Sequence, residues 1–159
     1  MDHNEFAART QAVRKRLYRT AYLYLGSEAD ALEAVDEAIY QALRSLKKLR
    51  EPDFFETWLT RILLNECSRE LRRRKRFHPD GDAAMPESAG PDAYDVLPLR
   101  EAVRRLPEEL RAVVVLRYFG GYTQAEAART LNVPQGTLAT RQRRALQLLR
   151  LELDEEVPQ

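Results

Sequence analysis

The chain has 159 residues, 26 Lys and Arg against 25 Asp and Glu, a hydrophobic content of 44% and one cysteine. This length allows one medium domain or two small ones. The sequence shows no apolar run near the roughly 20 residues of a membrane span, no secretory signal and no cysteine partner for a disulfide or cysteine-rich zinc site, which together favour a cytoplasmic protein.

Three helices are predicted in the first half of the chain, over about 4–25, 28–49 and 54–76. Apolar residues recur at helical spacing in each, and Pro52 separates the second helix from the third. The residues expected to be buried are Phe6, Val13, Leu17, Ala21 and Leu25, then Leu32, Val35, Ile39, Leu43 and Leu46, then Phe55, Trp58, Leu59, Ile62, Leu63 and Leu71.

The segment 78–95 is rich in Pro, Gly, Ala, Ser and Asp and has no helical or alternating period. Five acidic residues and no Lys or Arg occur in 77–99. Such a composition predicts a flexible, acidic linker, which we place at 77–95.

Four short helices are predicted in the second half, over about 97–105, 107–118, 124–131 and 135–153. Pro107 is expected in the first turn of its helix, and Thr123 is a suitable cap for the next one. No strand-like alternation is present. The predicted fold class is all-α, with two small helical domains, 1–76 and 96–159, joined by the flexible linker.

The stretch "TQAEAARTLNVPQGTLATRQRRALQLL" fits a helix-turn-helix. Small residues, Ala127 and Ala128, allow two helices to approach closely, and Asn132 tolerates the left-handed backbone that the turn needs. An ordinary helical hairpin would show the same spacing. The second helix favours DNA binding, because its early outward positions carry no acidic side chains. A recognition helix in the major groove is flanked by phosphates, which would repel acidic side chains. These positions are Gln135, Thr137, Ala139, Thr140 and Arg143.

The third predicted helix ends in the basic run "RRRKR". Seven Lys and Arg residues and two Glu occur in 61–76, and four Arg with no acid occur in 135–150. On the third helix, Arg61, Asn65, Arg69 and Arg72 follow at spacings of four, four and three, which makes a stripe along one face. Two basic regions on either side of an acidic segment indicate a polyanion contacted at two places.

No enzyme is expected. The two histidines lie far apart, at His3 and His78, and no nucleophile set, phosphate-loop glycine spacing or metal-ligand cluster is evident. No cofactor is expected either, and Cys67 is interpreted as a small, partly buried residue. The alternative to a two-site nucleic-acid binder is an ordinary helix-turn-helix regulator with an effector or dimerisation domain in front, which would need a sensor cavity or a dimer seam in 1–76.

Three stretches in order resemble the bacterial extracytoplasmic-function sigma factors. The most specific pieces are "WLTRILLN", "LPEELRAVVVLR" and "YTQAEAARTLNVPQGTL". The resemblance implies a transcription initiation factor that binds the clamp and flap of core RNA polymerase and directs it to promoter DNA. It also implies control by an anti-sigma factor that occludes the basic faces.

The resemblance assigns roles to both domains. Domain 1–76 would be sigma region 2, which binds core polymerase and the minus-ten element, with the loop 50–55 as the pocket for a flipped base. Domain 96–159 would be sigma region 4, which reads the minus-thirty-five element. The residues expected on the minus-ten side are Trp58, Arg61, Asn65, Arg69, Arg72, Arg73, Arg74, Lys75 and Arg76; those on the minus-thirty-five side are Gln135, Thr137, Ala139, Thr140, Arg141, Arg143 and Arg144; and those facing the clamp are Asp36, Glu37 and Arg44.

Three positions depart from the family's pattern. Many members carry Lys or Arg at Ala139 and an apolar residue at Gln142, so the preferred minus-thirty-five sequence is left open. Many carry Trp or Tyr at Leu43, which we interpret as a core substitution.

Overall fold

The computed structural model describes residues 1–77 and 93–156, and every regular element in these ranges is helical, which confirms the all-α prediction. The chain divides into two compact units, Met1–Met85 and Pro86–Gln159. Most of the predicted linker lies outside the described residues, so the linker and the domain boundaries stay predictions. Among the described residues, no helix has both the length and the hydropathy needed to cross a membrane.

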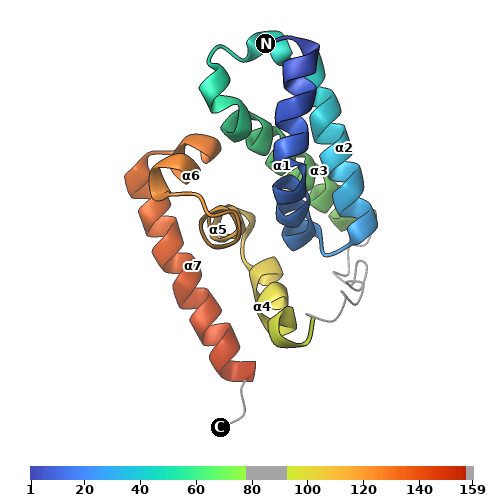
Figure 1. The fold of residues 1–159 in the computed structure, drawn as a ribbon. Helices are drawn as coiled ribbons and strands as arrows, with labels where there is room; N and C mark the ends of the chain where they lie inside the picture. Colours follow the sequence, from blue (N-terminus) through green and yellow to red (C-terminus); the bar gives the residue numbers. More distant parts are fainter. Residues whose placement is uncertain (78–92, 157–159) are drawn as a thin grey trace. The chain divides into compact units, whose positions relative to one another are not determined.

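The first unit contains three mutually packed helices, with two short 3₁₀ turns, η1 and η2, between the second and the third (Figure 1). Their bounds are α1 (His3–Leu25), α2 (Glu28–Arg44), η1 (Leu46–Lys48), η2 (Pro52–Phe54) and α3 (Phe55–Phe77). Gly26 caps the C-terminal end of helix α1; it has φ 72° and donates its N–H to the carbonyl oxygen of Tyr22 at 2.7 Å. This left-handed conformation suits glycine and allows the sharp turn into α2.

The buried face of α2 differs from the prediction. Four alanines at helical spacing, together with Val35, form the buried face of this helix: Ala31, Ala34, Ala38 and Ala42. Leu32 is 50% exposed and Leu43 is 40% exposed, so Leu43 is not a core residue. Helix α2 contacts both α1 and α3. Small side chains allow that close approach, and Leu32 and Leu43 are turned outward.

Most other core predictions for the first unit are confirmed. Buried as expected are Phe6, Leu17, Ala21, Leu25, Phe55, Leu59 and Leu63. Half-buried are Val13, Trp58, Ile62 and Leu71. Cys67, expected to be partly buried, is completely buried. The core of this unit therefore lies between α1, the alanine face of α2 and the apolar face of α3.

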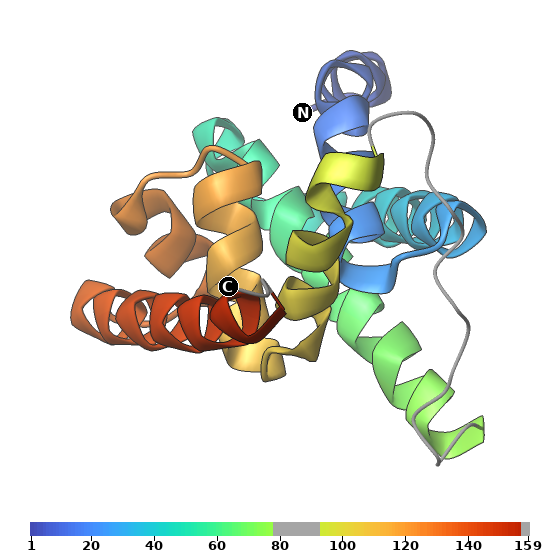
Figure 2. The same cartoon turned by 90° about the horizontal axis from the view of Figure 1, so that it is seen from below.

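In the second unit, the last helix contacts each of the other three α-helices (Figure 2). Its elements are α4 (Ala93–Arg105), α5 (Glu108–Val114), the π-helical turn η3 (Val115–Phe119), α6 (Gln124–Leu131) and α7 (Gln135–Glu156). Pro107 caps α5 from just outside the helix, with φ −51° and ψ 145°, and so does not lie in the first turn as predicted. Its extended backbone marks the change of direction between α4 and α5.

Arg111 joins α5 to the end of α4. The side chain is buried, with the residue 9% exposed. Its guanidinium donates to the carbonyl oxygens of Val103 at 3.3 Å, Leu106 at 3.1 Å and Arg104. These carbonyls include the last ones of α4, which have no partner within the helix. Arg111 therefore closes the end of α4 and fixes the α4–α5 corner.

Candidate nucleic-acid interface

The polar stripe of α3 lies on a solvent-exposed face of the first unit. Arg61, Asn65, Arg69 and Arg72 are all exposed. Trp58 is half-buried, and its ring lies 6.3 Å from the ring of Phe55 at 47°. The tryptophan therefore belongs partly to the core and partly to the surface that continues into the stripe.

Within the basic run of α3, Arg74 is turned into the unit. Its side chain is only 13% exposed and forms an ion pair with Asp30. It also donates to the carbonyl oxygen of Leu25 at 2.8 Å and lies 3.5 Å from Glu70. Arg74 thus holds α3 against the α1–α2 turn. Sequence reasoning missed this role, because both Leu25 and Asp30 are more than 40 positions away.

Arg73 is also paired, but at the surface. It donates to Glu70 through Nε at 2.8 Å and Nη2 at 2.7 Å, and half of its side chain is exposed. The hydrogen bond from Arg73 is the main cause that holds the pKa of Glu70 below its usual value. Arg69 lies 3.5 Å from Glu66 and is largely exposed.

The remaining three basic residues of the run differ from Arg73 and Arg74. Arg72, Lys75 and Arg76 are exposed, and they make no ion pair or side-chain hydrogen bond within the described residues. Their charge is therefore available to a phosphate backbone without breaking an internal pair.

The loop before α3 is held by α1. Arg9 donates to the carbonyl oxygen of Pro52 at 2.8 Å and is itself oriented by Glu5 at 2.9 Å. Further along α1, Arg16 forms an ion pair with Glu56. The loop residues Glu51–Phe54 are exposed. A loop with an exposed edge and an anchored backbone can present polar groups in a fixed arrangement.

The ring of Phe6 adds an apolar anchor for this loop. It meets the ring of Phe55 edge-on, at 5.7 Å and 89°, and both residues are buried. Neither Arg9, Arg16 nor Phe6 was expected at a site. The sequence gives only a weak indication that these arginines anchor the loop, because an arginine on an amphipathic helix is ordinarily solvated.

The residues expected to face the polymerase clamp lie on the exposed part of α2. Asp36 accepts a hydrogen bond from Arg14 at 2.6 Å, and Glu37 accepts one from Gln41 at 3.0 Å. The Arg44 guanidinium lies over the ring of Tyr40 at 5.6 Å. Tyr40 is 54% exposed and, with the outward Leu32 and Leu43, adds apolar area to this charged face. The sequence prediction missed that area because it assigned the leucines to the core.

The helix-turn-helix has the local geometry that the sequence indicated. Thr123 and Glu126 form a capping box at the start of α6, with hydrogen bonds of 3.1 Å and 2.9 Å. Asn132 has φ 57° and ψ 48°, which is the left-handed conformation expected at the turn. Ala127, Ala128 and Leu138 are buried between the helices.

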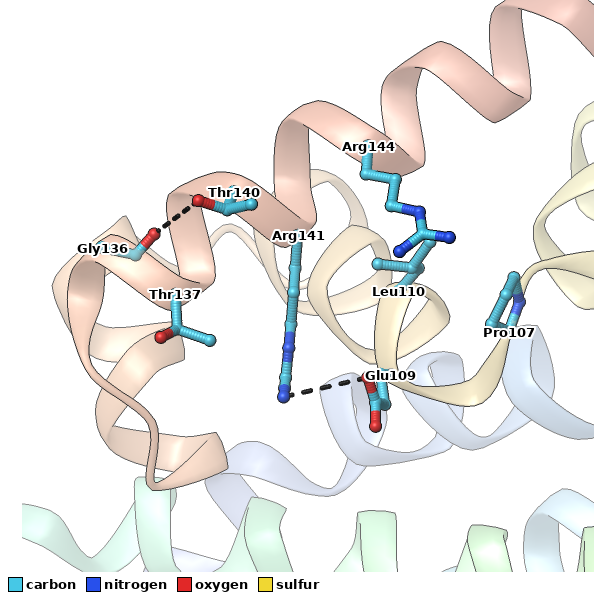
Figure 3. A pocket seen from close by; sticks show the side chains of 8 residues that line it. All are labelled: Pro107, Glu109, Leu110, Gly136, Thr137, Thr140, Arg141 and Arg144. Carbon is cyan, nitrogen blue, oxygen red and sulfur yellow. Dashed lines mark hydrogen bonds and ion pairs between the residues drawn. The ribbon is translucent and has the colours of Figure 1, made fainter.

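The predicted reading positions fall on the first turns of α7. Gln135, Thr140, Arg143 and Arg144 are exposed, whereas Thr137, Ala139 and Arg141 are half-buried. Thr140 donates its hydroxyl proton to the carbonyl oxygen of Gly136 at 3.1 Å. Arg141 points toward Glu109 of α5, at 3.8 Å (Figure 3). This face is basic and polar, with one acidic residue brought next to it by the fold.

Gln142 points back into the second unit. Its Oε1 accepts hydrogen bonds from Arg117 at 3.1 Å and Gln124 at 3.2 Å, and its Nε2 donates to the Tyr118 hydroxyl at 2.8 Å. Arg117 also donates to the carbonyl oxygen of Tyr122 at 2.6 Å. The polar side chain of Gln142 therefore has hydrogen-bond partners at this position, and these bonds connect α7 to η3 and α6. In the ranges 1–77 and 93–156, no group of His, Cys, Asp and Glu is arranged to hold a metal ion.

Comparisons with known proteins agree with this arrangement. Residues 10–77 match the family model of sigma-70 region 2, and residues 97–149 match that of sigma-70 region 4. The chain is 30% identical to the RNA polymerase sigma factor SigV of Bacillus subtilis, over 90% of this chain and 87% of that protein. It is 33% identical to the ECF RNA polymerase sigma factor SigM of Mycobacterium tuberculosis, over 82% of this chain and 68% of that protein.

A solved structure shares the fold. The sigma factor RpoE of Bartonella quintana, crystallised with the anti-sigma factor NepR, superimposes with a TM-score of 0.77 at 23% identity, over 94% of this chain and 97% of that chain.

Proposed function

We propose, because this chain belongs to the extracytoplasmic-function family of RNA polymerase sigma factors, that its two units divide promoter recognition between them. The first unit binds core polymerase and the minus-ten element, and the second binds the minus-thirty-five element. The observation that carries this division is the presence of an exposed basic surface on each unit, along α3 and on the first turns of α7.

On α3, phosphate affinity and base choice come from different residues. Arg72, Lys75 and Arg76 supply affinity, because they are exposed and have no internal partner among the described residues. Asn65 and the loop 50–55 supply base choice, supported by the anchoring of that loop on α1. Trp58, Arg61 and Arg69 extend the same surface. Arg74 contributes by holding the end of α3 in place.

On α7, the exposed residues of the first turns read bases and contact phosphates. Gln135 and Thr140 are suited to base edges, and Arg143 and Arg144 to guanine or to the backbone. The surface of α2 that carries Asp36, Glu37 and Arg44 docks on the polymerase clamp. The outward leucines of α2 support that docking, because an exposed apolar patch next to charges is typical of protein interfaces.

Run-off transcription with core polymerase on a genomic promoter library tests the proposal. Promoter-specific transcripts should appear only when this protein is added. Arg72→Ala should weaken promoter binding about equally for all sequences and reduce the salt slope by about one, whereas Asn65→Ala should alter the preferred minus-ten sequence. DNA binding without any transcript from core polymerase would instead indicate a regulator that is not a polymerase subunit.

We also infer control by an anti-sigma factor. The RpoE protein of similar fold was solved with such a partner. Exposed basic surfaces on both units would need to be covered in a resting cell to prevent unspecific binding. Affinity purification of the tagged protein from unstressed cells should recover a partner that suppresses run-off transcription. Full activity of the protein in those cells, with no partner recovered, would overturn this inference.

A further inference from the structure

A pocket of about 480 Å³ opens between the start of α5 and the first turns of α7 (Figure 3). Leu110 of α5 forms part of its wall, and Thr137 and Thr140 of α7 line the opposite side. Arg141 and Arg144 also line it, so two guanidinium groups face one small space. The pocket lies at the part of α7 that, in the proposed function, enters the major groove.

One acidic side chain lines this pocket, Glu109 of α5. Its Oε2 lies 3.8 Å from Nη2 of Arg141. The Glu109 side chain is 73% exposed, whereas the Arg141 side chain is 28% exposed. The distance is long and the carboxylate is solvated, so this ion pair is easily replaced by another anion.

The lining suits a phosphodiester. Two guanidinium groups can attract one phosphodiester, which carries a single negative charge, and donate to its oxygens. The Thr140 hydroxyl proton is engaged with Gly136, but the Thr137 hydroxyl makes no hydrogen bond within the described residues and can donate as well. A helix that lies in the major groove is flanked by backbone phosphates on both sides.

We propose that this pocket binds one backbone phosphate of duplex DNA, and that Glu109 acts as an internal counter-charge to Arg141 that lowers affinity for all duplexes. The proposal rests on minus-thirty-five binding by this unit. In the free protein Glu109 pairs with Arg141, and in the complex the phosphate takes its place while the carboxylate stays close enough to repel it. The effect is independent of sequence, so it reduces unspecific binding and leaves recognition to base contacts.

The test measures binding of the full-length protein to a fluorescent 30-base-pair duplex of random sequence, across a series of salt concentrations. Glu109→Gln removes the charge at the pocket. Glu108→Gln is the matched control, because it removes the same charge from the neighbouring exposed residue of α5, which does not line the pocket. Glu109→Gln should bind about fivefold more tightly at low salt, which is the effect of removing the repulsion between two unit charges about 4 Å apart in water, and Glu108→Gln should change affinity by less than about twofold.

Arg141→Ala supplies the second arm. It should lower the slope of log affinity against log salt concentration by about 0.9. Adding Glu109→Gln to Arg141→Ala should raise duplex affinity much less than Glu109→Gln does in the parent protein. If Arg141→Ala does not fold by circular dichroism, Arg144→Ala replaces it, with the same expected loss of slope. Equal effects of Glu108→Gln and Glu109→Gln, or a full Glu109→Gln gain without Arg141, would overturn the proposal.

These results are separable from the proposed function. If the parent protein neither binds duplex DNA nor supports run-off transcription, the proposed function fails. If it does both and the two glutamine variants behave alike, only the role of Glu109 fails.

Discussion

Arg9 and Pro52 lie 43 positions apart in the sequence, yet the Arg9 guanidinium donates to the Pro52 carbonyl oxygen at 2.8 Å. Glu5, one helical turn before Arg9, fixes the guanidinium from the other side. The first helix therefore holds the backbone of the loop 50–55, which is expected to receive a flipped promoter base. A backbone carbonyl has no side-chain pattern that could reveal such a contact in advance.

Arg9→Ala should slow promoter opening. The variant loses the hydrogen bond that fixes the loop, and a net hydrogen bond is worth about 0.5–1.5 kcal/mol, so we expect a loss of about threefold to tenfold. Permanganate reactivity at the minus-ten element of a promoter selected by run-off transcription measures the effect. Arg9→Lys should recover part of it. Arg19→Ala is the control, since Arg19 is exposed on the same helix and has no ion pair or side-chain hydrogen bond in the described part of the chain. Parent-like opening by Arg9→Ala would show that the loop needs no such anchor.

Arg74→Ala should destabilise the first unit, whereas Arg72→Ala should not. Arg74 is mostly buried and leaves Asp30 and the Leu25 carbonyl without their partner, so we expect a loss of about 2 kcal/mol in the free energy of unfolding. Replacing the exposed Arg72 with alanine should lower the free energy of unfolding by less than about 0.5 kcal/mol. Urea denaturation followed by the fluorescence of Trp58, the single tryptophan, measures this unit. A midpoint for Arg74→Ala equal to that of Arg72→Ala would contradict the internal role.

Glu70 should make the stability of the first unit depend on acid pH. The hydrogen bond from Arg73 lowers the pKa of Glu70 in the folded state below its ordinary value of 4.5. The ionised Glu70 therefore contributes its full stabilisation above the pKa that this residue has in the unfolded chain. That stabilisation is lost as the pH falls through the lower pKa of Glu70 in the folded protein. The difference in unfolding free energy between the parent and Glu70→Gln should be largest near neutral pH and shrink below about pH 4. A difference that is constant between pH 3 and pH 7 would show that ionisation of Glu70 does not stabilise the fold.

Arg111→Ala should destabilise the second unit. The substitution leaves three carbonyl oxygens at the α4–α5 corner without their buried donor, which we expect to cost about 2–4 kcal/mol. Thermal melting followed by circular dichroism should show a lower transition temperature for the second unit. The transition temperature of the first unit, followed by Trp58 fluorescence, should not change. A lowered Trp58 transition would instead show that the two units unfold together.

Gln142→Leu should weaken minus-thirty-five binding without changing base preference. Gln142 faces Arg117, Gln124 and Tyr118, so its loss loosens the position of α7 and does not remove a base contact. We expect a uniform loss corresponding to about 0.5–1 kcal/mol. Selection from duplexes with a randomised minus-thirty-five element measures preference and affinity together. Ala139→Lys, which adds a cation on the reading helix, is the contrasting variant and should shift the preference. A shift with Gln142→Leu would mean that Gln142 contacts DNA after all.

The amino-acid sequence by itself determined the features that depend on neighbours in the chain. The order of the helices, the cap at Thr123 and the left-handed Asn132 were predictable, because caps and backbone sterics act over a few residues. The family motifs were equally local, since each is a continuous stretch that spans no more than two consecutive helical elements.

Only the tertiary structure decided which side of each helix faces inward and which charges are free. The apolar period of α2 fitted a leucine face, but close packing against two helices selected the alanines. Five consecutive basic residues in α3 look equivalent in sequence, yet Arg74 is paired with partners 44 and 49 positions away, while Arg72, Lys75 and Arg76 have none among the described residues. The ion pair between Glu109 and Arg141 likewise exists only because the tertiary structure brings α5 next to α7. Electrostatic pairing depends on distance in space, and a linear pattern does not contain that distance.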